Sequence, residues 1–416
     1  MIARSVAIAM IAILSMPMAA ARADVSSDPV IEWNAIMATT TSGQNPFAQA
    51  RLAAITQLAV FEAVNAVTHD YEPYLGTVAA PAGASGEAAA VAAAHAVLVN
   101  YLPTQVDALD DARDATLASI PDGQSEQDGV AVGEAAAAAM IALRAGDGSS
   151  PPQFYLPTTS DPGEWQTTPT CPAAGGILFH WQNVTPFGVR SNDQFRAAPP
   201  PALSSPEYAR AYDEVLTVGG FESLERPVDR SDIARLYNSL LAVAVWNGVG
   251  RQLADEEPMS LSGHARAFAL LNMAINDSLT TVMESKYQYL FWRPETAIRA
   301  GDEDGNDRTA ADATYAPFIQ TPCFPSYPSA HASGSYAARA VLARLWGAGG
   351  HSIAISTPAL PGIEVHYTTL KQITSDIDDA RVYGGIHFRF DQDAGGKQGR
   401  HVGQYIFAND LQPLDP

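Results

Sequence analysis

The stretch FPSYPSAHASGS, residues 324–335, places a serine and a histidine where a helix is expected to begin. Ser329 is suited to cap that helix, because its hydroxyl can accept a hydrogen bond from a free backbone N–H in the first turn. Such N–H groups and the helix dipole attract anions, and Ala330 lets the backbone approach one closely. His331 could exchange a proton with a bound oxyanion. The pattern indicates an oxyanion site, although an ordinary serine cap with a passive histidine would look the same.

A second stretch, KYQYLFWRP, carries two cations at a spacing that puts them on one helical face. The helix predicted to begin at Ser262 has an apolar stripe that leads to Lys286 and then, seven residues later, to Arg293. Pro294 should end the helix there. Cations on a buried face are costly unless an anion neutralises them. The stretch therefore predicts two buried cations that share an anionic ligand.

A third stretch, ARVYGGIHFRFD, adds a cation, a histidine and a carboxylate. Gly384 and Gly385 weaken the helix between Arg381 and His387, so a bend would let both side chains point inward. Asp391 would accept from one ring nitrogen of His387 and leave the other free. Taken separately, a structural histidine and a surface salt bridge would explain these residues. Together, the three stretches supply three cations, a serine, helix N–H groups and two histidines, a set suited to a tetrahedral or trigonal-bipyramidal oxyanion.

The order and spacing of these residues resemble the three-part signature of the type 2 phosphatidic acid phosphatase (PAP2) superfamily. That superfamily includes acid phosphatases and the vanadium-dependent haloperoxidases. Local detail is closer to the haloperoxidases, because FWRP at 291–294 is similar to their first motif and GIHFRFD at 385–391 to their third. The resemblance is tight over 286–391 and looser elsewhere. It implies an all-α fold of two packed helical bundles, with the active site in the C-terminal bundle.

The resemblance also implies a vanadate cofactor and a role for each motif residue. His387 would bond vanadium, with Asp391 fixing its tautomer, and His331 would be the acid–base residue. The remaining groups would hold the vanadate oxygens: Lys286, Arg293, Ser329 and Arg381, with the backbone N–H of Ala330.

Four positions bear on how closely the chain follows the family pattern. Ala330 stands for the usual Gly and keeps the backbone N–H, whereas Ala380 stands for the usual Ser and loses a hydroxyl. Phe324 lies where chloride-oxidising relatives have a Phe near the halide. Met283 lies where they have a Trp. The halide preference therefore stays open.

The activity that the resemblance implies is oxidation of halide by hydrogen peroxide to hypohalous acid, which halogenates small organic substrates. The same cradle would suit a secreted acid phosphatase, with His387 as nucleophile and His331 protonating the leaving group. A non-catalytic oxyanion-binding family member is a second alternative, which the retention of both histidines and Asp391 disfavours.

The N-terminus is typical of an export signal. Arg4, the apolar run 5–18 and the small-residue site Ala21-Arg22-Ala23 predict a signal peptide over 1–23 and a secreted or periplasmic protein. We expect no membrane span, here or later in the chain. The formal net charge of −21 disfavours nucleic acid and anionic membranes as partners. The oligomeric state stays open.

The chain has two cysteines, Cys171 and Cys323. In an exported protein they can form a disulfide, and two free buried thiols are the alternative. We predict the disulfide, which would tie a Pro/Thr-rich segment to the residues that lead into Pro328.

Helical signals dominate the chain, and no stretch alternates like a strand over much length. We expect an N-terminal helical region over 24–148, a loop-rich cover over 149–228 and a catalytic helical bundle over 229–416. Individual helices are expected at 47–68, 85–101, 104–119, 125–144, 230–251, 329–346 and 366–383.

Overall fold

The computed structural model describes residues 28–414, which are mostly helical, so the all-α expectation is confirmed. The expected signal segment, 1–23, lies outside the described residues. The first half matches the four predicted helices closely and adds one before them. Its helices are α1 (Pro29–Thr40), α2 (Pro46–Thr68), α3 (Gly86–Tyr101), the short 3₁₀ helix η1 (Pro103–Gln105), α4 (Val106–Leu117) and α5 (Gln124–Arg144).

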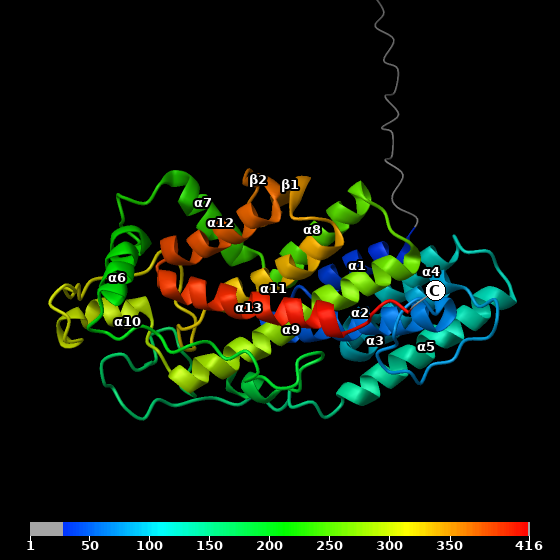
Figure 1. Ribbon diagram of the computed structural model, residues 1–416, viewed down its shortest axis with the longest axis horizontal. Coiled ribbons are helices and arrows are strands. Elements are labelled where there is room, and N and C mark those ends of the chain that lie inside the picture. Colours follow the sequence, from blue (N-terminus) through cyan, green and yellow to red (C-terminus); the bar gives the residue numbers. More distant parts are fainter. Residues whose placement is uncertain (1–27, 415–416) are drawn as a thin grey trace, which may run out of the picture.

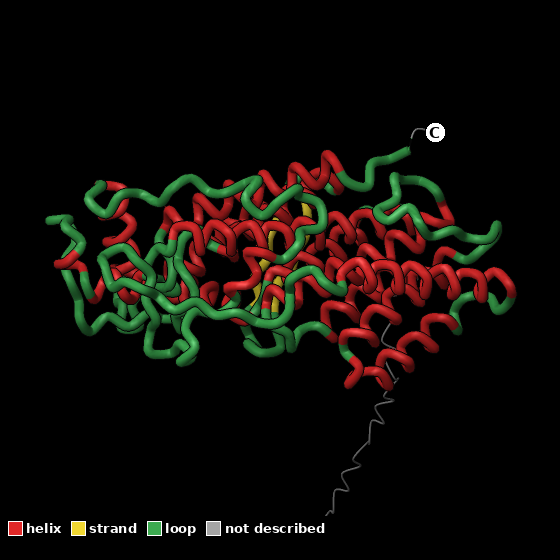
Figure 2. The backbone as a smooth tube through the Cα atoms, turned by 90° about the horizontal axis from the view of Figure 1, so that it is seen from below, coloured by secondary structure: helices red, strands yellow, loops and turns green. Residues whose placement is uncertain are grey.

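A long irregular segment separates these helices from the rest. Figure 1 shows α3, α4 and α5 at one end of an elongated molecule and α6 and α10 at the other. In Figure 2 the loops gather towards the second end. The later elements are η2 (Phe179–Asn183), α6 (Pro206–Gly219), α7 (Val228–Ser239), α8 (Ala242–Glu256), α9 (Leu261–Tyr289), α10 (Pro294–Arg299), η3 (Gly301–Glu303), α11 (Ala330–Leu345), β1 (Gly349–Ser356), β2 (Glu364–Thr369), α12 (Leu370–Tyr383) and α13 (Arg389–Asn409).

The longest helix, α9, connects the two halves of the molecule. It packs against α2 in the N-terminal half and against α11 and α13 in the C-terminal half. Every residue from Ser262 to Met283 is buried, so α9 has no solvated face over that length. A helix enclosed on all sides can carry its last turn, with Lys286, into the interior.

The helices α11 and α13 approach each other closely because glycines line their contact. A Cβ atom added at Gly395 would lie 2.3 Å from the carbonyl oxygen of Ser329. One added at Gly399 would lie 1.9 Å from the carbonyl oxygen of Ser333. Any side chain at these positions would push the helices apart. The contact therefore holds the beginning of α11 against the beginning of α13, where two of the three motifs lie.

Two expectations about helix boundaries are wrong. The helix expected over 230–251 is two helices, α7 and α8, because the backbone is extended at Leu240 and Leu241. The cap of α9 is Ser260, whose hydroxyl accepts from the first turn, and not Ser262. Both errors arise because apolar spacing continues across a break that only the backbone angles reveal.

The antiparallel hairpin of β1 and β2 was not expected, nor were the helices α6, which lies within the expected loop-rich cover, α10 and α13. Along β1, His351, Ile353 and Ile355 are buried and alternate with more exposed residues, which is the period-two pattern of a half-buried strand. Residues 366–369, expected as the start of a helix, belong to β2. The alternation is too short to stand out in a helical sequence.

The expectation that no later stretch could span a membrane needs correction for α2. Among the described helices, α2 alone is long and apolar enough to cross a membrane by length and composition. In the structure, 94% of that apolar window is buried within the protein. Because α2 packs against α3, α5 and α9, its composition matches that of an enclosed core helix.

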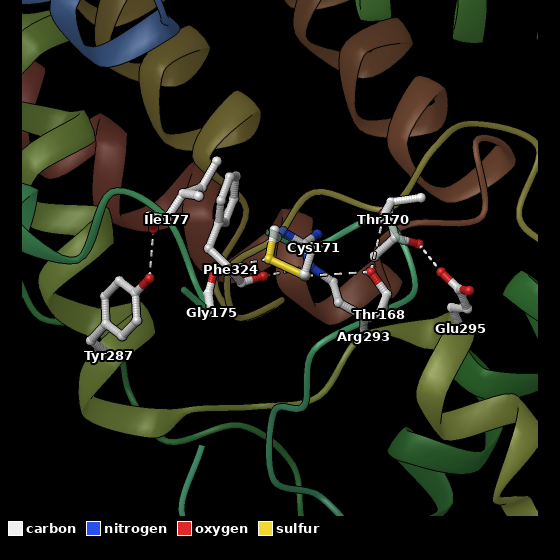
Figure 3. The surroundings of a disulfide bond; sticks show 11 residues. Thr168, Thr170, Cys171, Gly175, Ile177, Tyr287, Arg293, Glu295 and Phe324 are labelled. Carbon is white, nitrogen blue, oxygen red and sulfur yellow. Dashed lines mark hydrogen bonds between the residues drawn. A yellow bond between two sulfur atoms is a disulfide. The ribbon is translucent and has the colours of Figure 1, made fainter. Parts of the chain in front are cut away.

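The predicted disulfide between Cys171 and Cys323 is confirmed. It fastens the irregular segment after α5 to the residue before Phe324 (Figure 3). Two hydrogen bonds strengthen the attachment, from the Ile177 N–H to the Cys323 carbonyl at 2.9 Å and from the Tyr287 hydroxyl to the Ile177 carbonyl at 2.7 Å. The irregular segment is therefore held beside the site-bearing part of the chain.

The far end of α13 places one carboxyl group near another. Asp277, fully buried on α9, accepts the backbone N–H groups of residues 187–189 at 2.7, 2.7 and 3.0 Å. Asp410 lies close to it, and its Oδ2 has no hydrogen-bond partner among residues 28–414. Burial, and then the charge of Asp277, raises the pKa of Asp410 to about 7.

We expect Asp410→Asn to stabilise the protein at about pH 8 and to change little at about pH 5. The folded protein keeps Asp410 protonated up to about pH 7, whereas the unfolded chain releases that proton near its ordinary value. The contribution of Asp410 to the free energy of unfolding therefore falls as the pH rises from the ordinary pKa of Asp to about 7. The Asn side chain stays neutral throughout. Urea midpoints at both pH values measure the effect, with Asp122→Asn on an exposed loop as the control. Equal midpoints for parent and Asp410→Asn at the higher pH would contradict it.

Candidate active site

The first motif reaches the site by a different route from the one expected. α9 ends at Tyr289, and Leu290 adopts a left-handed conformation with φ of 47°. The chain then turns back, so that Arg293 becomes the N-cap of α10 and Pro294 its first residue. The prediction that Lys286 and Arg293 share one helical face is therefore wrong, although both are buried at the same place, as expected.

The second motif lies where the sequence predicts it. Ser329 is the N-cap of α11, and its hydroxyl accepts from the N–H of Ala332 at 3.3 Å. The Ser329 N–H donates to the carbonyl of Asp391 at 2.9 Å, which joins this motif to the third. Ala330 and His331 form the first turn of α11, and both line a small internal cavity.

The third motif bends as predicted. α12 ends at Tyr383, Gly385 has a φ of 76°, and α13 begins at Arg389. His387 therefore precedes α13 rather than lying on it. Its Nδ1 is 2.7 Å from Oδ2 of Asp391, so the expected histidine–carboxylate contact is confirmed.

Three cations converge on this point with one carboxylate among them. Lys286, Arg293 and Arg381 are at most 2% exposed. The Lys286 ammonium donates to the carbonyls of residues 325 and 326 at 2.8 and 2.7 Å. Nη2 of Arg293 and Nε of Arg381 have no hydrogen-bond partner among the described residues. Because Asp391 is a single negative charge, the cluster has unpaired donors and excess positive charge, which fits a bound oxyanion.

Burial lowers the pKa of every base in the cluster, and repulsion between neighbouring cations adds to it for all of them except Arg381. The pKa of Lys286 lies well below its usual value, first because of burial and then because of Arg293. Burial lowers the pKa of Arg293 to about 9 and that of Arg381 to about 10. The pKa values of His331 and His387 also fall well below their usual value, by burial first and then by the three cations. Both histidines are therefore neutral near pH 7 before an anion binds.

The tautomer of His387 follows from its contacts. A neutral ring that donates from Nδ1 to Asp391 carries its lone pair on Nε2. Nη1 of Arg293 lies 3.1 Å from that Nε2, and also donates to the Ile386 carbonyl at 2.9 Å. The lone pair of Nε2 therefore lies beside the Arg293 guanidinium, whose Nη2 has no partner among the described residues and would be satisfied by an oxyanion bound there.

A cavity of about 160 Å³ borders the cluster. His331, Arg381 and His387 form its polar wall, next to Phe324. The other walls are mostly apolar and come partly from segments outside the motifs: Phe47, Ile177, Leu178, Leu241, Val243 and Leu279. Nothing in the spacing of the motifs identifies these residues, because they approach only through tertiary packing.

Ser326 is a further site residue that sequence reasoning missed. Its hydroxyl donates to Oδ2 of Asp391 at 2.5 Å, and its backbone N–H donates to the Phe291 carbonyl at 2.9 Å. Its own carbonyl accepts from Lys286. A single buried serine therefore links the stretch 324–335, in which it lies, to both of the other motifs. Its position two residues after Phe324, inside that stretch, was the available signal.

We expect Ser326→Ala to weaken phosphate binding about 3- to 10-fold, because one hydrogen bond that positions the site typically contributes about 0.5–1.5 kcal/mol. Without the hydroxyl, the Asp391 carboxylate is positioned beside His387 by the Phe388 N–H alone, at 3.1 Å, and is held less firmly. Calorimetry gives the affinity, and ¹⁵N chemical shifts of His387 report its tautomer. Ser333→Ala is the matched control, since this buried hydroxyl donates to the Ser278 carbonyl at 3.2 Å. Unchanged affinity and an unchanged His387 spectrum in Ser326→Ala would refute the expectation.

Fold and site together define a helical-bundle protein with a centre suited to hold an oxyanion, and comparison with known proteins agrees. The family model for the VCPO second helical-bundle domain matches residues 266–415. Vanadium chloroperoxidase of Curvularia inaequalis is 27% identical over 186 residues, which cover 37% of this chain and 30% of that protein. The chain thus spans about a third of this curated relative.

Solved structures extend the likeness to nearly the whole chain. The first bacterial vanadium-dependent iodoperoxidase is 26% identical, with a TM-score of 0.78, covering 94% of this chain and 97% of that one. An apo-type bacterial vanadium-dependent chloroperoxidase shares the fold, with 18% identity and a TM-score of 0.72 over 88% and 94%. Together these findings fit a vanadium haloperoxidase, and the resemblance drawn from the three motifs is confirmed.

Proposed function

We propose that this protein is a vanadate-dependent haloperoxidase that oxidises halide with hydrogen peroxide to hypohalous acid. The observation that supports this most directly is the cluster of three buried cations with unpaired guanidinium donors around Nε2 of His387. An oxyanion centred there would satisfy the unpaired donors, and the neutral imidazole offers one bond to its central atom. The likeness to vanadium haloperoxidases supports vanadate as that anion.

Each residue has a defined task in this proposal. His387 would ligate vanadium through Nε2, with Asp391 holding its Nδ1–H. Vanadate, when bound, would supply a Lewis-acid centre that activates peroxide. The groups that would hold its oxygens are Lys286, Arg293, Ser329 and Arg381, with the backbone N–H of Ala330.

His331 would manage the proton of the reaction. Its ring lines the cavity, and its lowered pKa leaves it neutral and able to accept a proton from incoming peroxide. When neutral His331 takes the proton, it becomes positively charged beside three cations. A bound oxyanion with two or three negative charges would offset that added charge. An acid phosphatase or a non-catalytic binding protein would use the same cradle, but the relatives favour neither.

The cavity supports a preference for large halides. Its walls beyond the histidines and Arg381 are mostly apolar, including Phe324. A small chloride ion loses more hydration free energy on entering such a space than bromide or iodide does. We therefore propose iodide and bromide, rather than chloride, as the halides, with small organic molecules as final acceptors.

Export is also part of the proposal. The disulfide between Cys171 and Cys323 supports it, because disulfides persist in oxidising compartments. A secreted or periplasmic location agrees with the signal predicted over 1–23.

We expect vanadate-loaded protein to oxidise iodide and bromide with peroxide, faster than chloride, and phosphate to inhibit by competing for the same cradle. Halide turnover with and without added vanadate measures this, and the metal-free protein is assayed in parallel with a chromogenic phosphate ester. Efficient ester hydrolysis with no halide oxidation at any pH would replace this proposal with the phosphatase.

Replacing each of the two histidines should have a different effect on vanadate affinity and on halide turnover. His387→Ala removes the bond to the central atom, so vanadate affinity should be lost together with activity. His331→Ala keeps that bond and all three cations, so vanadate should still bind while halide turnover falls by about 10²- to 10⁴-fold. Calorimetry with vanadate, beside turnover at saturating vanadate, distinguishes the two. Loss of vanadate binding in His331→Ala with retention in His387→Ala would reverse the assigned roles.

A further inference from the structure

A second, larger pocket lies against the active-site cavity. Its volume is about 410 Å³, which is within the range of pockets that hold small organic molecules. Asn45, Ile177 and Leu178 line both this outer pocket and the inner cavity that contains His331 and His387. The two spaces therefore share one thin wall.

The shared wall is held firmly in an unfavourable backbone conformation. Leu178 has a φ of 66°, in the left-handed region that bulky residues rarely adopt. Its neighbour Ile177 is fixed by two hydrogen bonds: its N–H donates to the Cys323 carbonyl, and its carbonyl accepts from the Tyr287 hydroxyl (Figure 3). Such conformations persist only where the surroundings enforce them, and they cluster at functional sites.

The outer pocket is aromatic and offers little free charge. Tyr101, Phe154 and Trp181 line it. The guanidinium of Arg51 is already paired with Asp147 at 2.6 Å and lies over the Tyr101 ring. His180 accepts from a backbone N–H, and burial lowers its pKa.

An uncharged aromatic molecule fits these walls better than an anion does. Aromatic side chains attract another ring through stacked or edge-to-face contacts. A carboxylate or phosphate would find Arg51 as the one Lys or Arg among the lining residues, and its Nε and Nη2 already donate to Asp147 and to the Arg144 carbonyl. One of the lining residues, Phe154, also exposes apolar surface to solvent, at 47% exposed.

We propose that the outer pocket is a docking site for a neutral phenol-type aromatic compound, which is halogenated beside the centre where hypohalous acid forms. The proposal rests on the proposed function for the halogenating agent. With hypobromous acid, a ring carbon forms a bond to bromine as the bromine–oxygen bond breaks. The displaced ring proton and the released hydroxide leave as water. A bound ring presents one edge to the shared wall, so the position of bromination should be selected.

Phenol is the probe, and Phe154→Ala is the test variant because its exposed side chain can be removed without opening the core. Phe221→Ala is the control, since Phe221 is 61% exposed and lies outside both pockets. Phenol affinity is measured by NMR titration of the vanadate-free protein, so the result does not depend on turnover. We expect Phe154→Ala to weaken phenol binding by about 3- to 10-fold, the worth of one aromatic contact. Phe221→Ala should leave it unchanged.

The product ratio gives the second measurement. Phenol brominated by the loaded parent enzyme should differ in its ortho to para ratio from phenol brominated by free hypobromous acid, and Phe154→Ala should move the ratio towards that of the free acid. Equal phenol affinity in all three proteins, or a parent ratio identical to that of the free acid, would overturn the proposal. If the protein oxidises no bromide, the proposed function fails separately, and the phenol affinities alone decide whether the docking site exists.

Discussion

The organisation of this protein depends on burying three cationic side chains in one cluster. Lys286, Arg293 and Arg381 are enclosed with Asp391 as the carboxylate that partly offsets them. Bringing such charges out of water costs several kcal/mol per ion, on the order of the whole stability of a domain. The fold must therefore supply many dipoles in place of water, and it does so with the carbonyls of residues 324–326 and 386.

This requirement explains why the site is made from irregular backbone between helices. Carbonyls inside a helix are occupied by their own hydrogen bonds, whereas those in the turns before α11 and α13 are free to face a cation. The helices around them, α9, α11 and α13, supply the rigid enclosure. The disulfide and the irregular segment that it anchors close the site on another side.

The sequence identified the chemistry of the site better than its geometry. Residue types and order were enough to select the cations, both histidines, Ser329 and Asp391, because few side chains can serve a buried oxyanion. The turn at Leu290 was not foreseen, because left-handed residues at helix ends are usually Gly or Asn, and leucine gives no such signal. Ser326 and the cavity walls from Phe47 and Ile177 were missed because they act through contacts between distant segments, which periodicity does not encode.

The glycine-lined contact between α11 and α13 has a consequence for how this protein can change. The carbonyl of Ser329 faces Gly395 across that contact, while the N–H of the same serine bonds the carbonyl of Asp391. The contacts of Ser329 with Gly395 and Asp391, called here the junction, therefore set both the packing of the two helices and the distance between the two motifs. A substitution that widened the junction would alter core packing and anion geometry together. Substitutions in the surrounding walls, in contrast, can change the shape of the cavity while the junction and the anion centre stay the same.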